Sequence, residues 1–319
     1  MVKPKIIVSR CLGFDKCRYN GEIIRSETIE MLKEYVKFIS VCSEVEIGLG
    51  IPREPLRIAE SSGEKHLIQP ATDKDFTKEL NEWNKSFFDK YKDVDGFILK
   101  NRSPSCGIKD VRIYKGFSKT SSAYKGSGFF GGFLMEQFPF HPIEDEGRLL
   151  NYEIRDHFFV KLFALTKFKE IKKKNIINEL NRFHSENKLL FMAYNQTGLR
   201  KLGRILASYD KSNKEFVFEE YEKEFLKIFT KKAGIGSFIN VLQHAFGGMS
   251  DKLSSEEKKF FLNSLEEYRD ERIPLTTVSY LILSMSVRFK NEYLINQTLL
   301  NPYPQDLIKI SDSGKKLRR

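Results

Sequence analysis

The pattern of hydrophobic and polar positions changes near residue 150. Before that point, short apolar runs predict buried strands at 5–9, 38–42 and 96–100. Between these runs, helical spacing predicts helices at 27–38 and 72–92, and Thr72 is the expected N-cap of the second. Strands that alternate with helices in this way are typical of an α/β domain with a mostly parallel sheet.

After residue 150 the apolar positions recur with the length and period of helices, and strand-like alternation is scarce. Ser254 or Ser255 is the expected cap of one such helix, with glutamates in its first turn. A proline, a charge run and a glycine at 141–150 indicate a boundary. The pattern therefore predicts an α/β domain at 1–148, followed by an all-helical (all-α) domain at 149–319.

Composition adds a charge asymmetry to this picture. Residues 1–150 carry 24 basic and 22 acidic side chains, whereas the remainder carries 30 and 21, a net charge of +9. Such an excess fits a domain that binds a polyanion, and a basic surface kept for solubility is the plainer alternative. No run of 18 apolar residues and no secretory signal occur, so we expect a cytoplasmic protein without a membrane span.

Four cysteines, all in the first part, are the main candidates for chemistry. Their separations of 6, 25 and 64 residues match neither the close pairs of structural zinc sites nor a redox C-x-x-C. Cys11 and Cys106 follow predicted strands, and Cys42 ends one. The carboxyl ends of parallel strands share one edge, so we expect the three cysteines to converge. Soft thiolates favour zinc or an iron–sulfur cluster, while inert core thiols and a catalytic thiol are the alternatives.

Two polar residues lie beside these cysteines. Glu44 is two residues past Cys42, and Ser103 is three residues before Cys106. A carboxylate and a hydroxyl next to a metal site form a plausible proton-transfer pair. The plainer interpretation makes Glu44 a surface residue and Ser103 an N-cap before a proline at the first helical position.

Three ordered motifs resemble the thiouracil desulfidase family: VSRCLGFDKCRYNGE at 8–22, VCSEVEIGLGIPREP at 41–55 and LKNRSPSCG at 99–107. The resemblance covers about the first 150 residues. The second part resembles a separate helical family of unknown function, most clearly in FHSENKLLFMAYNQTGLRKLG at 183–203. A desulfidase part followed by this helical part resembles the domain order of the tRNA 4-thiouridine desulfidases.

The resemblance implies a [4Fe–4S] cluster with one open iron, held by Cys11, Cys42 and Cys106. It leaves out Cys17, which stands where relatives carry valine. It also implies that Glu44 acts as base or proton shuttle and that Ser103 positions or protonates a ring heteroatom of the substrate. The sequence departs from the family pattern at Ser43, where proline is usual, and at Arg10, where a small residue precedes the first cysteine.

We therefore expect a desulfidase that removes sulfur from 4-thiouridine in tRNA by non-redox hydrolysis. The helical domain is expected to hold the tRNA, with Arg200, Lys201 and Arg204 as candidate phosphate contacts, although a solvated basic face would look the same. One alternative is an enzyme that acts on free thiouracil or another thiolated pyrimidine base. The other is a metal-containing protein that binds nucleic acid without catalysis.

Overall fold

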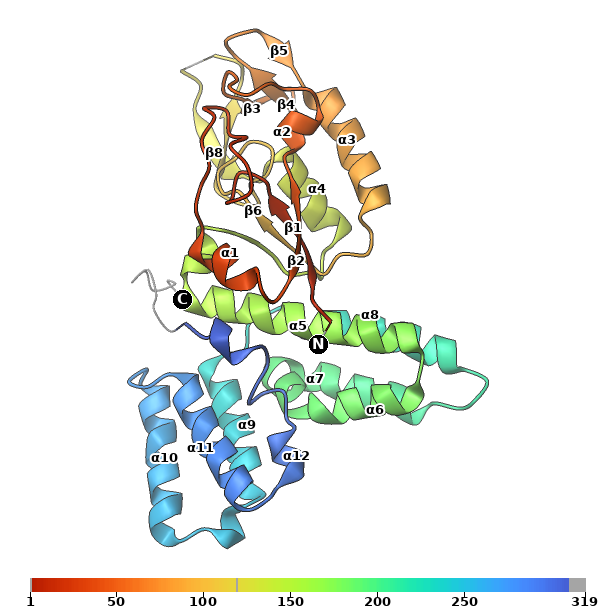
Figure 1. Cartoon of the computed structure of the whole chain (residues 1–319), viewed down its shortest axis with the longest axis vertical. Helices are drawn as coiled ribbons and strands as arrows, with labels where there is room; N and C mark the ends of the chain where they lie inside the picture. The colour runs from red at the N-terminus through yellow and green to blue at the C-terminus, as the bar shows by residue number, and fades with distance from the viewer. Residues whose placement is uncertain (1, 119, 310–319) are drawn as a thin grey trace. The chain divides into compact units, whose positions relative to one another are not determined.

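The chain forms two compact units. The computed structural model describes residues 2–118 and 120–309 (Figure 1). Among these, the residues up to Thr166 and those from Asp306 onward form one unit, and Lys167–Gln305 form the other. The helix α5 (Tyr152–Lys174) contributes residues to both. The domain boundary predicted at 148/149 therefore remains a prediction, because the compact first unit continues into α5.

The first unit contains a four-stranded parallel sheet in which three strands fit the predicted ones, whereas the fourth lies at 143–145, within the segment predicted as a boundary. Its order is β2-β1-β6-β9, with the strands β1 (Lys5–Ser9), β2 (Lys37–Val41), β6 (Gly96–Leu99) and β9 (Ile143–Asp145), and all three pairings are parallel. Every residue of β6 is buried, as are four of the five in β1. Strands covered on both faces need a continuous apolar run rather than alternation, which explains why these short apolar segments form them.

A second sheet in the same unit was not predicted. Its order is β5-β4-β3-β7-β8, with the strands β3 (Arg57–Ser61), β4 (Glu64–Gln69), β5 (Lys74–Asp75), β7 (Val111–Lys115) and β8 (Ala123–Gly126). Only β3 and β7 pair in parallel. The β3–β4 hairpin turns on Ser62 and Gly63, which both have positive φ, as a two-residue type I′ turn requires.

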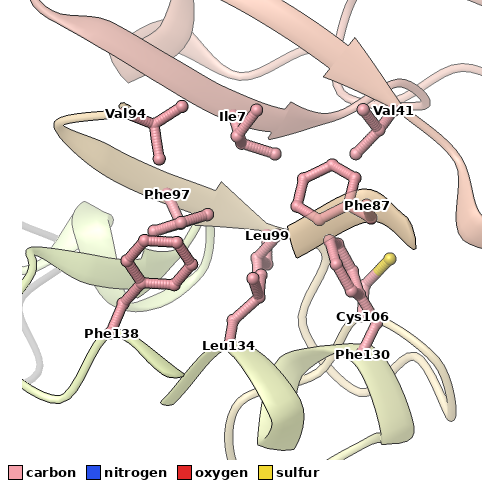
Figure 2. Close-up of a cluster of buried hydrophobic side chains, with 10 residues drawn as sticks. All are labelled: Ile7, Val41, Phe87, Val94, Phe97, Leu99, Cys106, Phe130, Leu134 and Phe138. Carbon is pink, nitrogen blue, oxygen red and sulfur yellow. The ribbon is translucent and has the colours of Figure 1, made fainter. Parts of the chain in front are cut away.

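Two helices, α3 (Thr77–Lys90) and α4 (Phe129–Gln137), pack against the parallel sheet. Figure 2 shows the core they share with the strands, in which Phe130 and Leu134 of α4, and Phe138 just after it, point toward Phe97 and Leu99 of β6. Cys106 belongs to this core, so one candidate ligand is anchored directly on the packed interior. Two shorter helices, α1 (Glu27–Leu32) and α2 (Ser43–Glu46), also belong to this unit.

The rest of the described chain is helical, as predicted. After α5 come α6 (Ile177–Glu186), α7 (Lys188–Ala207), α8 (Lys214–Ile228), α9 (Ile235–Gly247), α10 (Ser255–Arg269), α11 (Leu275–Arg288) and α12 (Glu292–Ile295). Short 3₁₀ segments lie at Arg148–Leu150, Ser250–Lys252 and Gln305–Leu307. Ser254 caps α10 in a reciprocal capping box with Glu257. No helix in the described part of the chain is long and apolar enough to cross a membrane.

Two local predictions were wrong. The helix expected at 27–38 ends at Leu32, because β2 already begins at Lys37. Thr72 is not an N-cap: its hydroxyl bonds to Gln69, and β5 keeps the following residues extended. The helix α3 starts only at Thr77, whose backbone N–H donates to Asp75 Oδ1 at 2.8 Å.

Candidate metal centre

Three of the four cysteines follow three neighbouring strands. Cys42 comes directly after β2, Cys11 is two residues past β1, and Cys106 lies in the loop that follows β6. These strands are adjacent and parallel, in the order β2-β1-β6, so their carboxyl ends lie at one edge of the sheet. The fold thus places the cysteines where open α/β sheets bind ligands.

All four cysteines are free and buried, including Cys17. The Cys42 thiol lies 4.0 Å from the carbonyl oxygen of Cys17. A hydrogen bond with Cys11 raises the pKa of Cys17 to about 12, and a hydrogen bond with Cys17 raises the pKa of Cys42. Burial, and then the nearby Cys42, raises the pKa of Cys106 to about 11. These mutual effects mean that the four thiols lie in one neighbourhood.

The chemistry of this donor set fits an iron–sulfur cluster. Buried thiols are soft ligands, and they bind metal only as thiolates, so a soft cationic group must replace their protons. Within the described residues, no three His, Cys, Asp or Glu side chains are arranged to hold a single metal ion. An iron–sulfur cluster does not require its cysteines to surround a single ion, because each cysteine binds a different iron.

The loop that carries Cys106 is fixed by the start of α4. Backbone N–H groups of Gly128, Phe129 and Phe130 donate to carbonyl oxygens of the loop at 2.7–3.0 Å, and Gly107 accepts the first of these bonds. A Cβ on Gly131 would lie 2.3 Å from the carbonyl oxygen of Gly107. A Cβ on Gly128 would likewise lie 2.5 Å from the carbonyl oxygen of Ser105, so these two glycines are required for the close approach.

Glu44 is not the surface residue of the plainer interpretation, since it is only 9% exposed. Its carboxylate oxygen Oε2 accepts two hydrogen bonds from Arg53, at 2.6 Å from Nη2 and 2.9 Å from Nε. The remaining guanidinium nitrogen donates to the backbone carbonyls of Cys17 at 3.1 Å and Gly50 at 3.2 Å. Arg53 thus ties the carboxylate, which α2 carries, to the backbone at Cys17 and at Gly50.

The two serines of the SPSC motif link Glu44 to the Cys106 loop. Ser105, which is fully buried, donates to Glu44 Oε1 at 2.5 Å, and its hydroxyl oxygen lies 2.9 Å from that of Ser103. Ser103 Oγ accepts from the backbone N–H of Cys106 at 3.1 Å. That bond resembles an N-cap, but no helix follows, since residues 104–106 form a turn. Glu44 and Ser103 therefore belong to one hydrogen-bonded group beside Cys106.

Comparison with known proteins matches both parts of the chain to families. The family described as 2-thiouracil desulfurase matches residues 6–146. A Bacillus subtilis (strain 168) protein, YbbK, is 38% identical over 138 residues, which cover 41% of this chain and 89% of YbbK. The chain belongs to the 2-thiouracil desulfurase family. The family resemblance expected from the three motifs is thereby confirmed.

Outside the desulfurase part, a family of unknown function, DUF1722, matches residues 188–304. The Escherichia coli (strain K12) protein YbgA is 24% identical over 161 residues, which cover 50% of this chain and 95% of YbgA. A solved structure of the [4Fe–4S]-dependent thiouracil desulfidase TudS shares 27% identity, with a TM-score of 0.37, and the match covers 46% of this chain and 93% of that chain. The expected division into a desulfurase part and a separate helical family is confirmed.

In this desulfurase, sequence reasoning missed Arg53, Ser105 and Ser9. Ser9 is buried at the end of β1, and its hydroxyl oxygen accepts from the backbone N–H of Lys100 at 2.9 Å, with Cys106 as a second partner. Arg53 and Ser105 do stand within the quoted motifs, but nothing in their spacing marks them as partners of Glu44. Arg10, one of the two expected departures from the family pattern, forms an ion pair with Glu46 at the end of α2.

The three basic residues proposed for RNA lie in the DUF1722 part. A break in helical geometry at Asn195 divides α7 into two halves. The second half carries the three basic side chains, all exposed: Arg200, Lys201 and Arg204. The side chain of Asn195 accepts from the backbone N–H of Gly198 at 2.9 Å, as an N-cap does. Lys201 lies 3.5 Å from Glu224, so part of its charge is already paired.

Proposed function

We propose that this protein is a tRNA 4-thiouridine desulfidase that uses a [4Fe–4S] cluster held by Cys11, Cys42 and Cys106. The observation that carries this proposal is the position of the three cysteines after three adjacent parallel strands, beside the Glu44–Ser105–Ser103 group. Membership of the 2-thiouracil desulfurase family supports the sulfur-removing activity, and the basic helical part supports an RNA substrate.

When bound, a cluster with one open iron supplies a soft Lewis acid for the thiocarbonyl sulfur of the substrate. The residues of the chain supply the proton transfers. Glu44 accepts a proton from the water that attacks the ring carbon, and Ser103 donates to a ring heteroatom. The C=S bond is replaced by C=O, with one water consumed and one hydrogen sulfide released. The carbon keeps its oxidation state, so the reaction needs no external electron donor.

The proposal is tested with the full chain, purified without oxygen and analysed for iron and sulfide. Thiolated tRNA, free 4-thiouracil and free 2-thiouracil are then supplied separately, and released sulfide is measured. We expect turnover of thiolated tRNA with the highest kcat/KM. Faster turnover of the free bases would favour the thiouracil enzyme instead. A colourless protein without iron that still binds tRNA would favour the non-catalytic alternative.

The roles of Glu44 and Ser103 are tested with Glu44→Gln and Ser103→Ala. Each variant should keep its iron, because neither side chain is a proposed ligand, and should lose about 10²–10⁴-fold in turnover, as expected for loss of a general acid or base. Glu46→Gln is a matched control, since Glu46 is a nearby exposed glutamate whose carboxylate pairs with Arg10. Wild-type turnover in either test variant would remove that residue from the mechanism.

The RNA-binding role rests on the net charge of +9 beyond residue 150 and on the exposure of Arg200, Lys201 and Arg204. Arg200 and Arg204 are four residues apart, so they share one helical face. Each phosphate contact should contribute a slope of about 0.7–0.9 in log affinity against log salt concentration. Extraction of a base from its stack costs a few kcal/mol, roughly, and backbone contacts of this kind can offset that cost.

Reversal of the three charges to glutamate should therefore weaken tRNA binding and flatten its salt dependence, with unchanged iron content. A control triple variant at Lys259, Arg269 and Arg272 makes the same change in net charge on and just after α10. If both triple variants lose affinity equally, total charge rather than this face of α7 holds the RNA. If neither loses affinity, the helical part is not the RNA holder.

A further inference from the structure

The hydrogen bonds around Ser105 have a direction that follows from their chemistry. Glu44 forms an ion pair with Arg53, and an ionised carboxylate only accepts hydrogen bonds. Apart from Ser103, the Ser105 hydroxyl has two possible acceptors, Glu44 Oε1 at 2.5 Å and Cys106 Sγ at 3.9 Å. The single proton points to Glu44 Oε1, because the carboxylate oxygen is the closest and is charged. Ser105 Oγ in turn accepts the proton of Ser103 across 2.9 Å. The chain of bonds thus runs from Ser103 through Ser105 to Glu44.

The same direction restricts what Ser103 can do. Its hydroxyl oxygen already accepts from the backbone N–H of Cys106 at 3.1 Å, and its proton is committed to Ser105. In this arrangement Ser103 accepts but has no proton left to donate to a substrate. Ser103 becomes a donor only if the chain reverses, which requires Glu44 to carry a proton. The acid and the base of the proposed reaction are then parts of one unit.

We infer that Ser105 is a positioning residue that relays a proton between Glu44 and Ser103 and so couples water activation to protonation of the substrate. This inference rests on the proposed function, in which Glu44 and Ser103 act on a thiolated pyrimidine. Arg53 holds only Oε2 of Glu44, which leaves Oε1 for Ser105. Both Ser105 and the Arg53–Glu44 pair are shielded from solvent, so bulk water does not replace the relay.

The proton balance of the relay is closed. As the water oxygen bonds to the ring carbon, one proton of the water passes to Glu44. Glu44 then donates to Ser105 Oγ, Ser105 releases its own proton to Ser103, and Ser103 releases its proton to the substrate heteroatom. Each hydroxyl gains one proton and loses one, and Glu44 returns to its ionised form. When the C–S bond breaks and the C=O bond forms, the relayed proton and the remaining proton of the water leave with the sulfur as hydrogen sulfide. No oxidant or reductant takes part.

The relay is tested in the full, iron-loaded chain with Ser105→Ala and Ser105→Thr. Removal of the hydroxyl should lower kcat about 10–100-fold, less than removal of Glu44, with little change in KM for the thiolated substrate. Ser105→Thr keeps a hydroxyl and should restore turnover. The dependence of kcat on the deuterium content of the solvent should be curved in the wild type, where several protons move, and linear in Ser105→Ala. Iron content is measured in each variant, because Ser105 precedes Cys106.

A second readout does not depend on activity. The infrared difference between wild type and Glu44→Gln isolates the carboxylate band of Glu44. The same difference taken in the Ser105→Ala background should show that band shifted, because the carboxylate has lost a hydrogen bond. An unshifted band overturns the proposed contact. A shifted band with wild-type turnover and an unchanged isotope dependence overturns the relay while the desulfidase function stands. A loaded wild type without turnover of any thiolated pyrimidine overturns the function itself.

Discussion

The ion pair between Arg53 and Glu44 provides the sharpest quantitative prediction. The two side chains are 5% and 12% exposed, and Arg53 Nη2 lies 2.6 Å from Glu44 Oε2. Removal of one partner from a buried pair typically costs about 3–5 kcal/mol, because the other charge remains without compensation. Arg53→Met also removes the donors to two backbone carbonyls, each worth about 0.5–1.5 kcal/mol. We expect a loss near the upper end, about 4–5 kcal/mol.

This loss is measurable in the unit that contains the site. Trp83 is the only tryptophan in the sequence and lies in α3, with its ring 5.0 Å from that of Phe130 and 5.1 Å from that of Phe87. Its fluorescence therefore reports on unfolding of the first unit. With a urea m-value of about 2 kcal/mol per M, a loss of about 4 kcal/mol lowers the unfolding midpoint by about 2 M. All variants are compared at equal iron content.

Two controls distinguish the effect of leaving the Glu44 carboxylate buried and unpaired from that of a general packing defect. Lys125→Met breaks an exposed pair with Asp110 in the same unit and should cost less than about 1 kcal/mol. Adding Glu44→Gln to Arg53→Met removes the stranded charge and should recover part of the stability. The reasoning is refuted if Arg53→Met lowers the midpoint no more than Lys125→Met does. It is also refuted if the second substitution lowers the midpoint further.

Three further predictions concern the cysteines, the close approach of α4 and acid stability. Iron per chain should fall when Cys11, Cys42 or Cys106 is replaced by alanine, and it should persist in Cys17→Ala. Loss of iron in Cys17→Ala together with full iron in Cys106→Ala would contradict the ligand assignment. Gly131→Ala should displace the Cys106 loop and lower iron content, whereas Gly236→Ala, where a Cβ has open space, should not. Burial lowers the pKa of His184 from 6.5 to about 4. The unfolded chain therefore binds more protons than the folded chain between these pH values, so the stability of the helical unit should fall as pH drops from 6.5 to 4. Circular dichroism measures this loss, which should be smaller in His184→Gln.

Three strands of the parallel sheet were predictable because they are short and mostly apolar, whereas β9 has the sequence IED and shows no such run. Segments such as 5–9 and 96–100 are long enough to be covered on both faces, and a continuous apolar run is the signal for that environment. The second sheet was missed because its strands are half-exposed and interrupted by charges, as in RIAES at 57–61 and VRIYK at 111–115. Their pairing depends on tertiary neighbours more than on local pattern.

Of the candidate site, only the common location of three cysteines was predictable, because it follows from the order of strands and helices. Once Cys11, Cys42 and Cys106 were assigned to the exits of parallel strands, their common edge followed from the geometry of such sheets. The same argument says nothing about Cys17, which follows no strand and yet lies against two of the others. It also gave no sign that Glu44 is buried, since a carboxylate on a four-residue helix is usually solvated.

The partners of Glu44 depend on contacts that no local pattern encodes. Ser105 reaches the carboxylate because its loop is held by the first backbone N–H groups of α4, a helix more than 20 residues further along the chain. That approach requires glycine at 131, where any Cβ would meet the carbonyl oxygen of Gly107. The glycines of GFFGG and the serines of SPSC are easily seen in the sequence, but their contact is not. The proposed proton relay therefore depends on how the loop is folded, and a substitution in α4 should disturb it as a substitution in the motif does.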